Sequence, residues 1–253
     1  MNTFRKGLFL GASVAALTLG AAHSASAAEA NNDYSAHRSW YVSLFGGISL
    51  PESMDSSTTY TATTGAVTPG YIYNIDMDSG FIIGSAIGTE LWDNVRGEIE
   101  FAFRSSDSGT INFSHPGLAL NPFSSTGDVT SVTILANLWY DFESISDTRS
   151  IRPYVGGGIG IGFIDADIQF ALFPGSGFGF IDNDTAFAFQ VGTGINWELS
   201  DRTSLGVGYR LKGLSGVDFV NLLVPGAPGL VQSNDLDVIL SHNFIVNLTW
   251  TLN

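Results

Sequence analysis

Charged side chains occupy alternate positions between residues 96 and 104, with Ala102 as the one exception. Because successive side chains of a β-strand point to opposite faces, these charges would share one face of a strand. Two later stretches add similar charges, and the full set is Arg96, Glu98, Glu100, Arg104, Glu198 and Arg210. Opposite charges in an enclosed interior form structural ion pairs or an electrostatic gate. We expect these six residues to pair structurally, with gating of a narrow path as the alternative.

Aspartates form a second candidate site, because they gather near the predicted ends of several strands. Four of them are expected to face one another across one hairpin, namely Asp165, Asp167, Asp182 and Asp184. Oxygen ligands of this kind bind calcium, although no ordered calcium-loop motif surrounds these positions. The alternatives are a solvated rim or a rim that favours cations. The sequence indicates no firm metal site and no cofactor.

Composition narrows the class of protein. The 253 residues carry 10 basic and 24 acidic side chains, a formal net charge of −14, and charged residues make up only 13% of the chain. Such a chain lacks the basic patch that nucleic-acid binding requires. The absence of cysteine excludes disulfides, thiolate metal sites and a cysteine nucleophile. Few charges together with 44% hydrophobic residues suit a protein that lies in a membrane.

The first 28 residues have the pattern of a secretory signal peptide. Arg5 and Lys6 precede an apolar run from Gly7 to Ala22, and small residues follow at 25–27. The run is short for a membrane-spanning helix, which needs about 20 residues. We therefore predict a signal peptide at 1–28 and a periplasmic segment at 29–39, with a retained N-terminal anchor as the alternative.

The rest of the chain alternates between apolar and polar residues, as strands with one apolar face do. Eight segments show the pattern, namely Trp40–Leu50, Phe81–Glu90, Val95–Arg104, Val129–Phe142, Arg152–Phe163, Thr185–Leu199, Ser204–Leu211 and Asp235–Leu252. The long connections between them are 51–80, 105–128, 164–184 and 212–234. Long and short connections in alternation are typical of a transmembrane barrel, whose sheet must close in lipid. We predict an all-β fold for residues 40–253: an eight-stranded antiparallel transmembrane β-barrel with long outer loops and short periplasmic turns.

Large and small residues are expected to complement each other inside such a barrel. Bulky inward side chains fall on the first, third and fourth strands, and glycines recur on the lumen face of the fifth to seventh. We expect the large side chains to fill the space beside the glycines, with an off-centre path as the alternative. An aromatic girdle is predicted at the periplasmic interface, formed by Trp40, Tyr41, Trp92, Trp139, Tyr140, Tyr154, Trp197 and Trp250.

Three of the long connections have apolar centres, which is unusual for segments in water. Their large apolar residues include Phe113, Leu118, Phe170, Phe173, Leu222 and Val224. Exposed apolar patches tend to mark contacts, so these residues are candidates for a contact surface. The alternatives are a lid folded over the barrel mouth and a vestibule for a hydrophobic small molecule.

Several strand motifs resemble the small outer-membrane β-barrel family of opacity-type and OmpA/OmpX-type surface proteins. The motifs are WYVSLFGG at 40–47, VRGEIEF at 95–101, NLWYDF at 137–142 and RPYVGGGIG at 152–160. The resemblance implies a location in the cell outer membrane, insertion by the barrel insertion machinery, and contact with lipid and lipopolysaccharide. It implies a surface protein that supports envelope integrity and contacts an extracellular ligand or host surface. A narrow porin-like channel for small or hydrophobic solutes is the alternative.

Catalysis has little support, although some small barrels modify lipids. Ser241 and His242 are adjacent, so a strand would point them to opposite faces and they could not act as a dyad. No G-x-S-x-G, G-x-G-x-x-G or H-E-x-x-H motif occurs. We predict that the protein is not an enzyme, and a lipid-active barrel enzyme is the least favoured alternative.

Overall fold

A computed structural model of the chain describes residues 39–62, 64–115, 118–119, 123–145, 150–170, 178–221, 230–236 and 238–252. The predicted signal peptide at 1–28 and all but the last residue of the predicted periplasmic segment lie outside these ranges. All elements are strands, as the alternating pattern predicts. In the described ranges, no helix is long and apolar enough to cross a membrane.

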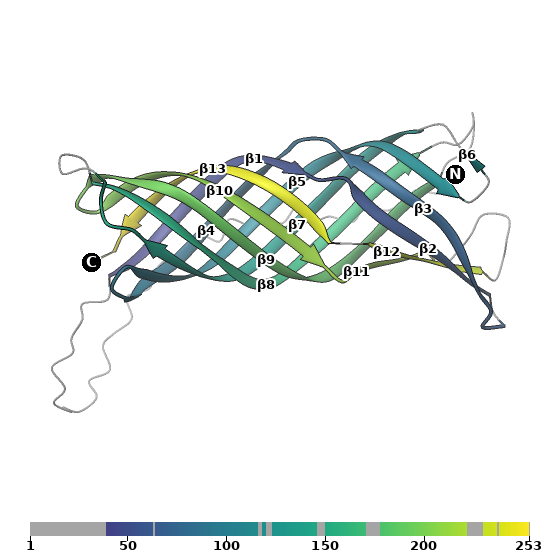
Figure 1. The fold of residues 1–253 in the computed structure, drawn as a ribbon, viewed down its shortest axis with the longest axis horizontal. Helices are drawn as coiled ribbons and strands as arrows, with labels where there is room; N and C mark the ends of the chain where they lie inside the picture. The colour runs from purple at the N-terminus through teal and green to yellow at the C-terminus, as the bar shows by residue number, and fades with distance from the viewer. Residues whose placement is uncertain are drawn as a thin grey trace, which may run out of the picture. The chain divides into compact units, whose positions relative to one another are not determined.

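Eight strands form a closed antiparallel barrel (Figure 1). Around the ring they are β5 (Val95–His115), β4 (Gly80–Trp92), β1 (Trp40–Pro51), β13 (Ile239–Thr251), β10 (Thr203–Ser215), β9 (Phe178–Ser200), β8 (Ile151–Phe170) and β7 (Phe123–Asp141). The pairing of β5 with β7 closes the ring. Each predicted segment corresponds to one of these strands, so the predicted barrel and its strand number are confirmed. The described short turns lie at one end, which we call the periplasmic end, and the opposite end is the outer end.

The strands run further toward the outer end than the sequence pattern predicted. Short strands continue four of the barrel strands after brief interruptions, namely β2 (Met54–Ala62), β3 (Val67–Met77), β11 (Val217–Asn221) and β12 (Leu230–Leu236). The register is kept across the breaks, since Ser49 pairs with Gly80 and Met54 with Ile75. A two-residue strand, β6 (Leu118–Ala119), pairs with β5. Most of the residues predicted to form the four long connections are therefore strand.

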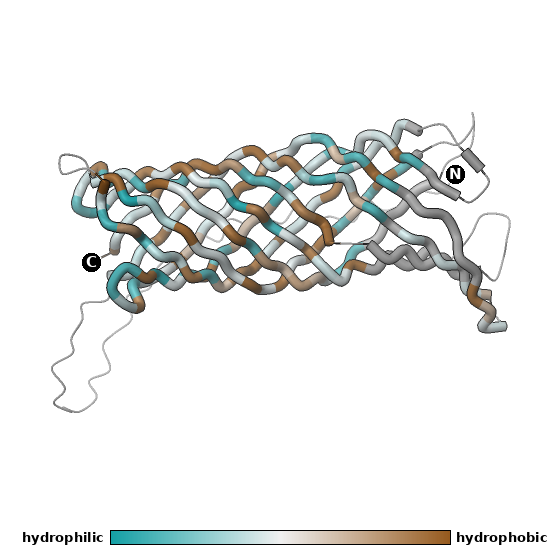
Figure 2. The backbone as a smooth tube through the Cα atoms, in the orientation of Figure 1, coloured by the Kyte–Doolittle hydropathy of each residue, from teal (hydrophilic) through white to brown (hydrophobic). Residues whose placement is uncertain are grey.

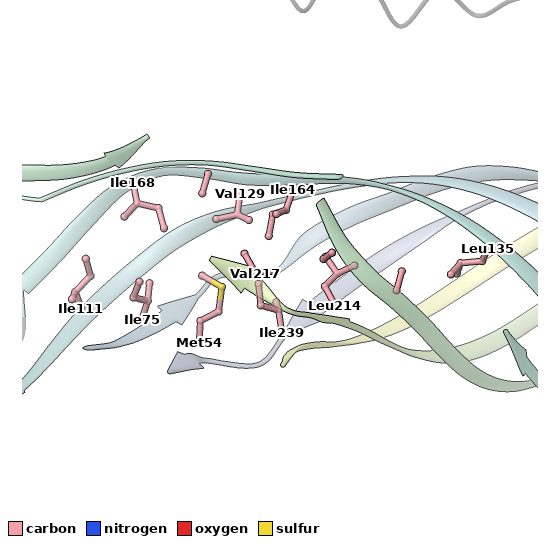
Figure 3. Packing of buried hydrophobic residues seen from close by; sticks show 13 residues of the cluster. Met54, Ile75, Ile111, Val129, Leu135, Ile164, Ile168, Leu214, Val217 and Ile239 are labelled. Atoms are coloured by element: carbon pink, nitrogen blue, oxygen red, sulfur yellow. The ribbon is translucent and has the colours of Figure 1, made fainter. Parts of the chain in front are cut away.

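An apolar core inside the outer half explains this extension. Inward side chains from nine of the labelled strands pack together there, including Met54, Ile111, Ile164, Leu214 and Ile239 (Figure 3). Removal of apolar surface from water stabilises a fold by about 25 cal/mol per Å². The predicted long connections carry apolar residues at alternate positions. Because these residues are buried in the core, the connections continue as strands.

Many exposed apolar side chains cover the outer surface of the barrel, as expected of strands that face lipid, and we call them the apolar band. Figure 2 shows hydrophobic and hydrophilic residues interspersed along the strands. The exposed side chains of the band include Leu44, Ile83, Phe101, Leu138, Ile159, Phe187 and Val246. Trp40, Trp92, Tyr140 and Trp250 are exposed near the periplasmic end, which fits the predicted girdle. Tyr41, Trp139 and Tyr154 are buried, so the girdle prediction is wrong for these three. Trp40 and Tyr41 are neighbours in one strand and must face opposite sides.

Candidate functional site

Glu100 lies at the centre of a charged layer that crosses the barrel lumen. Its side chain is fully buried, with 0% exposure, and it is ion-paired with Arg210 and Lys212 of β10. The Lys212 Nζ to Glu100 Oε1 distance is 2.6 Å. Gln190 of β9 and Asn137 of β7 donate hydrogen bonds to Glu100 Oε2 at 3.0 and 3.1 Å. The Glu100 carboxylate on β5 therefore binds side chains from three other strands, β7, β9 and β10.

Glu98 lies two residues earlier on the same face and is also buried. It accepts hydrogen bonds from the Tyr41 hydroxyl at 3.0 Å, from Trp139 Nε1 at 2.7 Å and from Asn137 Nδ2 at 3.1 Å. Its oxygens are thus satisfied by neutral donors. Hydrogen bonds of this kind offset the free-energy cost of burying a charged carboxylate.

Arg96 forms the periplasmic edge of the layer. It makes a two-point ion pair with Asp141, with Nε–Oδ2 and Nη2–Oδ1 distances of 2.5 and 2.9 Å. Its guanidinium lies 5.4 Å from the centre of the Tyr41 ring, within cation–π range. Below this pair a polar vestibule of about 250 Å³ opens at the periplasmic end. Glu198 lines that vestibule, and its pairing with Arg152 at 3.2 Å is partly exposed.

Large side chains fill the space beside the glycines, as the sequence predicts. Trp139 lies against glycines of the neighbouring strands β8 and β9, and a Cβ at Gly156 would come within 2.7 Å of its ring and 2.1 Å of the Leu138 carbonyl oxygen. Arg210 in turn lies 5.3 Å from the Trp139 ring and 4.7 Å from the Phe45 ring. The predicted complementarity is confirmed, and the lumen beside these glycines is occupied by side chains.

The structure brings together five of the six predicted lumen charges. Glu98, Glu100, Arg104 and Arg210 are buried in the lumen and Arg96 is nearly so, whereas Glu198 is half-exposed on the wall of the vestibule that Arg96 also lines. Lys212 and Asp141 belong to the same layer and were missed. Lys212 follows Arg210 by two residues and so shares its face, but the predicted strand ended at Leu211. A longer strand would have identified it from alternation alone.

The four aspartates do not face one another, so the predicted arrangement of a calcium site is wrong. Asp165 pairs across the sheet with Asn183 and Asp167 with Ile181, whereas Asp182 and Asp184 lie opposite Ala166 and Ile164. Residues opposite each other share a face, so Asp165 and Asp167 lie on one face of the sheet and Asp184 lies on the other. The register instead places Asp107, Asp128 and Asp167 in one row on adjacent strands. Within the described residues, no group of three or more His, Cys, Asp or Glu residues could hold a metal ion.

The predicted contact surface is only partly reached by the described residues. Phe113, Leu118 and Phe170 belong to strands β5, β6 and β8, but their side chains are outside what is described. Phe173, Leu222 and Val224 lie outside the described residues altogether. The contact surface thus stays a prediction.

His242 belongs to a second polar cluster, on the outer face of the barrel. Its Nδ1 lies 2.6 Å from the Tyr209 hydroxyl, and its Nε2 lies 2.9 Å from a Glu52 carboxylate oxygen. Ser241 is fully buried on the lumen side. The two neighbours therefore face opposite sides, as alternation requires, and offer no nucleophile and base in one place.

Comparison with known proteins agrees with this geometry. The sequence profile of a family described as outer membrane protein beta-barrel domain matches residues 12–250. The chain belongs to this family. It is therefore a small outer-membrane β-barrel protein, and no curated protein matches it in sequence.

Solved barrels of this class resemble the chain at low sequence identity. Neisserial surface protein A (NspA) is 14% identical, with 84% of this chain and 97% of that chain covered and a TM-score of 0.46. OprG from Pseudomonas aeruginosa is 14% identical, with 83% and 96% covered and a TM-score of 0.46. Ail of Yersinia pestis, solved with the heparin analogue sucrose octasulfate, is 12% identical, with 81% and 98% covered and a TM-score of 0.32.

Proposed function

We propose that the protein is a non-conducting surface barrel that supports the outer membrane and presents its outer end for contact outside the cell. The filled lumen is the observation that supports it. Glu100 and its partners occupy the middle of the barrel, and an apolar core occupies the outer half. The separation of Ser241 from His242 favours a role without catalysis.

A solute from the periplasmic side would meet three successive obstacles. The vestibule ends at the Arg96–Asp141 pair, and the layer around Glu100 follows. Beside Arg104 the next space measures about 20 Å³, enough for one or two water molecules but not for an organic solute. Leu214 and Ile239 then begin the apolar core, and a dry apolar constriction also blocks ions.

The outer surface supports the remaining parts of the proposal. The apolar band would hold the barrel in the bilayer, next to lipid and lipopolysaccharide, after export by the signal peptide and insertion by the barrel machinery. Strands β5, β7, β8 and β9 are 19 to 23 residues long, about twice the length that crosses a membrane. Their outer ends would therefore stand clear of the lipid and carry the contact surface for an extracellular ligand or a host surface.

Conductance in a planar bilayer tests the proposal. The mature protein would be refolded in detergent, its folding verified by heat-dependent gel mobility, and single channels recorded. We expect a silent bilayer from folded protein. In parallel, cells that carry the protein with residues 171–177 replaced by a glycine–serine linker should adhere less to host cells than wild-type cells. Discrete conductance steps from the wild-type barrel would contradict the proposal that it does not conduct. Unchanged adhesion of the linker variant would contradict the proposed contact outside the cell.

The alternative is a narrow channel gated by the charged layer, and the vestibule favours it because polar space reaches Arg96 from the periplasm. Under that alternative, the wild-type protein conducts and Glu100→Gln changes the step size. Glu198→Gln is the matched control, since its carboxylate lies at the half-exposed mouth. Steps that appear in the wild type and change only with Glu100→Gln would establish the gate.

A further inference from the structure

The buried charges inside the barrel do not balance. Among the described residues, the buried charged side chains are Glu98, Glu100, Arg104, Arg210 and Lys212, two acidic and three basic. The neighbouring Arg96 and Asp141 neutralise each other. The buried part of the lumen therefore carries one surplus positive charge, while the remaining charges of the vestibule lie at its open mouth. An unpaired charge in a dry interior costs several kcal/mol unless a counter-charge or hydrogen bonds compensate it.

The surplus charge is located at Arg104. Its side chain is only 7% exposed, and no hydrogen bond or ion pair joins it to any residue within the described ranges. Glu100, the carboxylate at the centre of the layer, already pairs with Arg210 and Lys212. Arg104 instead lines the cavity of about 20 Å³ between the charged layer and the apolar core.

The polar groups around this cavity are mainly hydrogen-bond donors. Lys212 lines the cavity, and its ammonium group donates one hydrogen bond to Glu100. The other N–H groups of the ammonium remain available as donors. The Thr133 hydroxyl is buried and has no partner within the part of the chain that is described. Ser241 Oγ accepts a hydrogen bond from Asn243, so its own proton is free to be donated. The rest of the wall is apolar, from residues such as Ile82 and Leu214.

We propose that this cavity binds one small monovalent anion, of which chloride is the obvious example. Two cations, Arg104 and Lys212, and the hydroxyl residues Thr133 and Ser241 line it, and one negative charge there would neutralise the surplus. Its volume excludes phosphate, sulfate and carboxylates, and its partly apolar wall suits a weakly hydrated anion. The anion would be a structural ligand that joins the charged layer to the apolar core, and the inference holds whether or not the barrel conducts.

Halide-dependent stability tests the site. Folded barrel in detergent would be unfolded by urea in sodium gluconate and in mixtures with sodium chloride or bromide at constant ionic strength, so that charge screening is the same throughout. We expect the wild-type unfolding constant to fall with halide concentration, by about 100-fold at 100 times the dissociation constant. Arg104→Met should abolish this dependence, while Arg152→Met, which removes a half-exposed cation at the vestibule, should keep it.

The outcomes separate clearly. Equal unfolding of the wild type in chloride and gluconate, or an unchanged halide response in Arg104→Met, would overturn the anion site. If Arg104→Met does not fold, Thr133→Val decides, because it removes one donor without changing side-chain shape and should weaken the halide response several-fold. Bromide-grown crystals of the wild type should then show an anomalous peak in contact with Arg104. The site would be refuted if the peak were missing and the unfolding of Thr133→Val depended on halide concentration as strongly as that of the wild type.

Discussion

Glu100 and Lys212 form an ion pair of 2.6 Å inside the barrel although 112 residues separate them in the chain. The same carboxylate also pairs with Arg210, so one acidic group on β5 compensates two cations on β10. Because β5 and β10 are not neighbours in the ring, this contact crosses the lumen and connects opposite walls of the barrel.

Glu100→Gln should therefore destabilise the barrel strongly. The substitution keeps the shape of the side chain but leaves Arg210 and Lys212 buried without a negative partner. Loss of one partner of a buried ion pair costs about 3–5 kcal/mol, and urea unfolding in detergent or lipid vesicles measures it.

Glu198→Gln is its matched control. The Arg152–Glu198 pair is half exposed at the periplasmic mouth, with side-chain exposures of 50% and 42%. An exposed pair contributes about 0–1 kcal/mol, so the control should unfold close to the wild type. Equal effects of the two substitutions would show that the layer around Glu100 adds nothing beyond a surface ion pair.

Gly156→Ala should destabilise the barrel because a Cβ has no room there. It would meet the Leu138 carbonyl oxygen at 2.1 Å and the Trp139 ring at 2.7 Å, and backbone cannot move aside easily. We expect a cost of about 1–3 kcal/mol, read from the urea midpoint. Gly46→Ala is the comparison, since its nearest contact is 3.6 Å, and it should be close to neutral. A neutral Gly156→Ala would mean that the Trp139 packing is loose.

Ile164→Ala tests whether the outer half holds a true core. Ile164 is 2% exposed inside the barrel, and its truncation should cost about 2–5 kcal/mol through lost burial and an unfilled cavity. Ile161→Ala, three residues earlier on the lipid side, should cost less because lipid chains can fill the space. A smaller effect at Ile164 than at Ile161 would argue against a packed core in this half.

Ile159→Arg tests the lipid-facing band. The Ile159 side chain is 62% exposed near the middle of the band, and arginine near the bilayer midplane destabilises barrels by about 2–4 kcal/mol. Thr126→Arg, at an exposed position of β7 beyond the band, should cost little. Unfolding in lipid vesicles measures the free energy of unfolding of both variants. If the apolar band lies in lipid, Ile159→Arg must lose more stability than Thr126→Arg.

Much of the candidate site follows from alternation in the sequence, because the facing of a side chain in a strand is a local property. Arg96, Glu98 and Glu100 share a face for this reason. The same rule, applied strictly, would have separated Tyr41 from Trp40 and Asp165 from its supposed partners.

The extent of the strands could not be predicted in the same way. The apolar residues of the outer half, such as Ile111 and Val217, were assigned to loops because the sequence does not say what they pack against. In the structure they pack against one another from strands that are distant in the chain. Burial depends on the assembled barrel, and burial decides how far each strand extends. The positions of the strand ends therefore could not be read from the sequence.

The all-β class, the eight strands, their antiparallel order and the face of most lumen residues could all be predicted from the amino-acid sequence. These depend on a two-residue period and on the lengths of connections, both of which are local. The contacts across the lumen, such as Glu100 with Lys212, and the surplus charge at Arg104 became visible only in the folded barrel. Those contacts depend on the tilt and stagger with which the barrel closes, and these accumulate over all eight strand pairings.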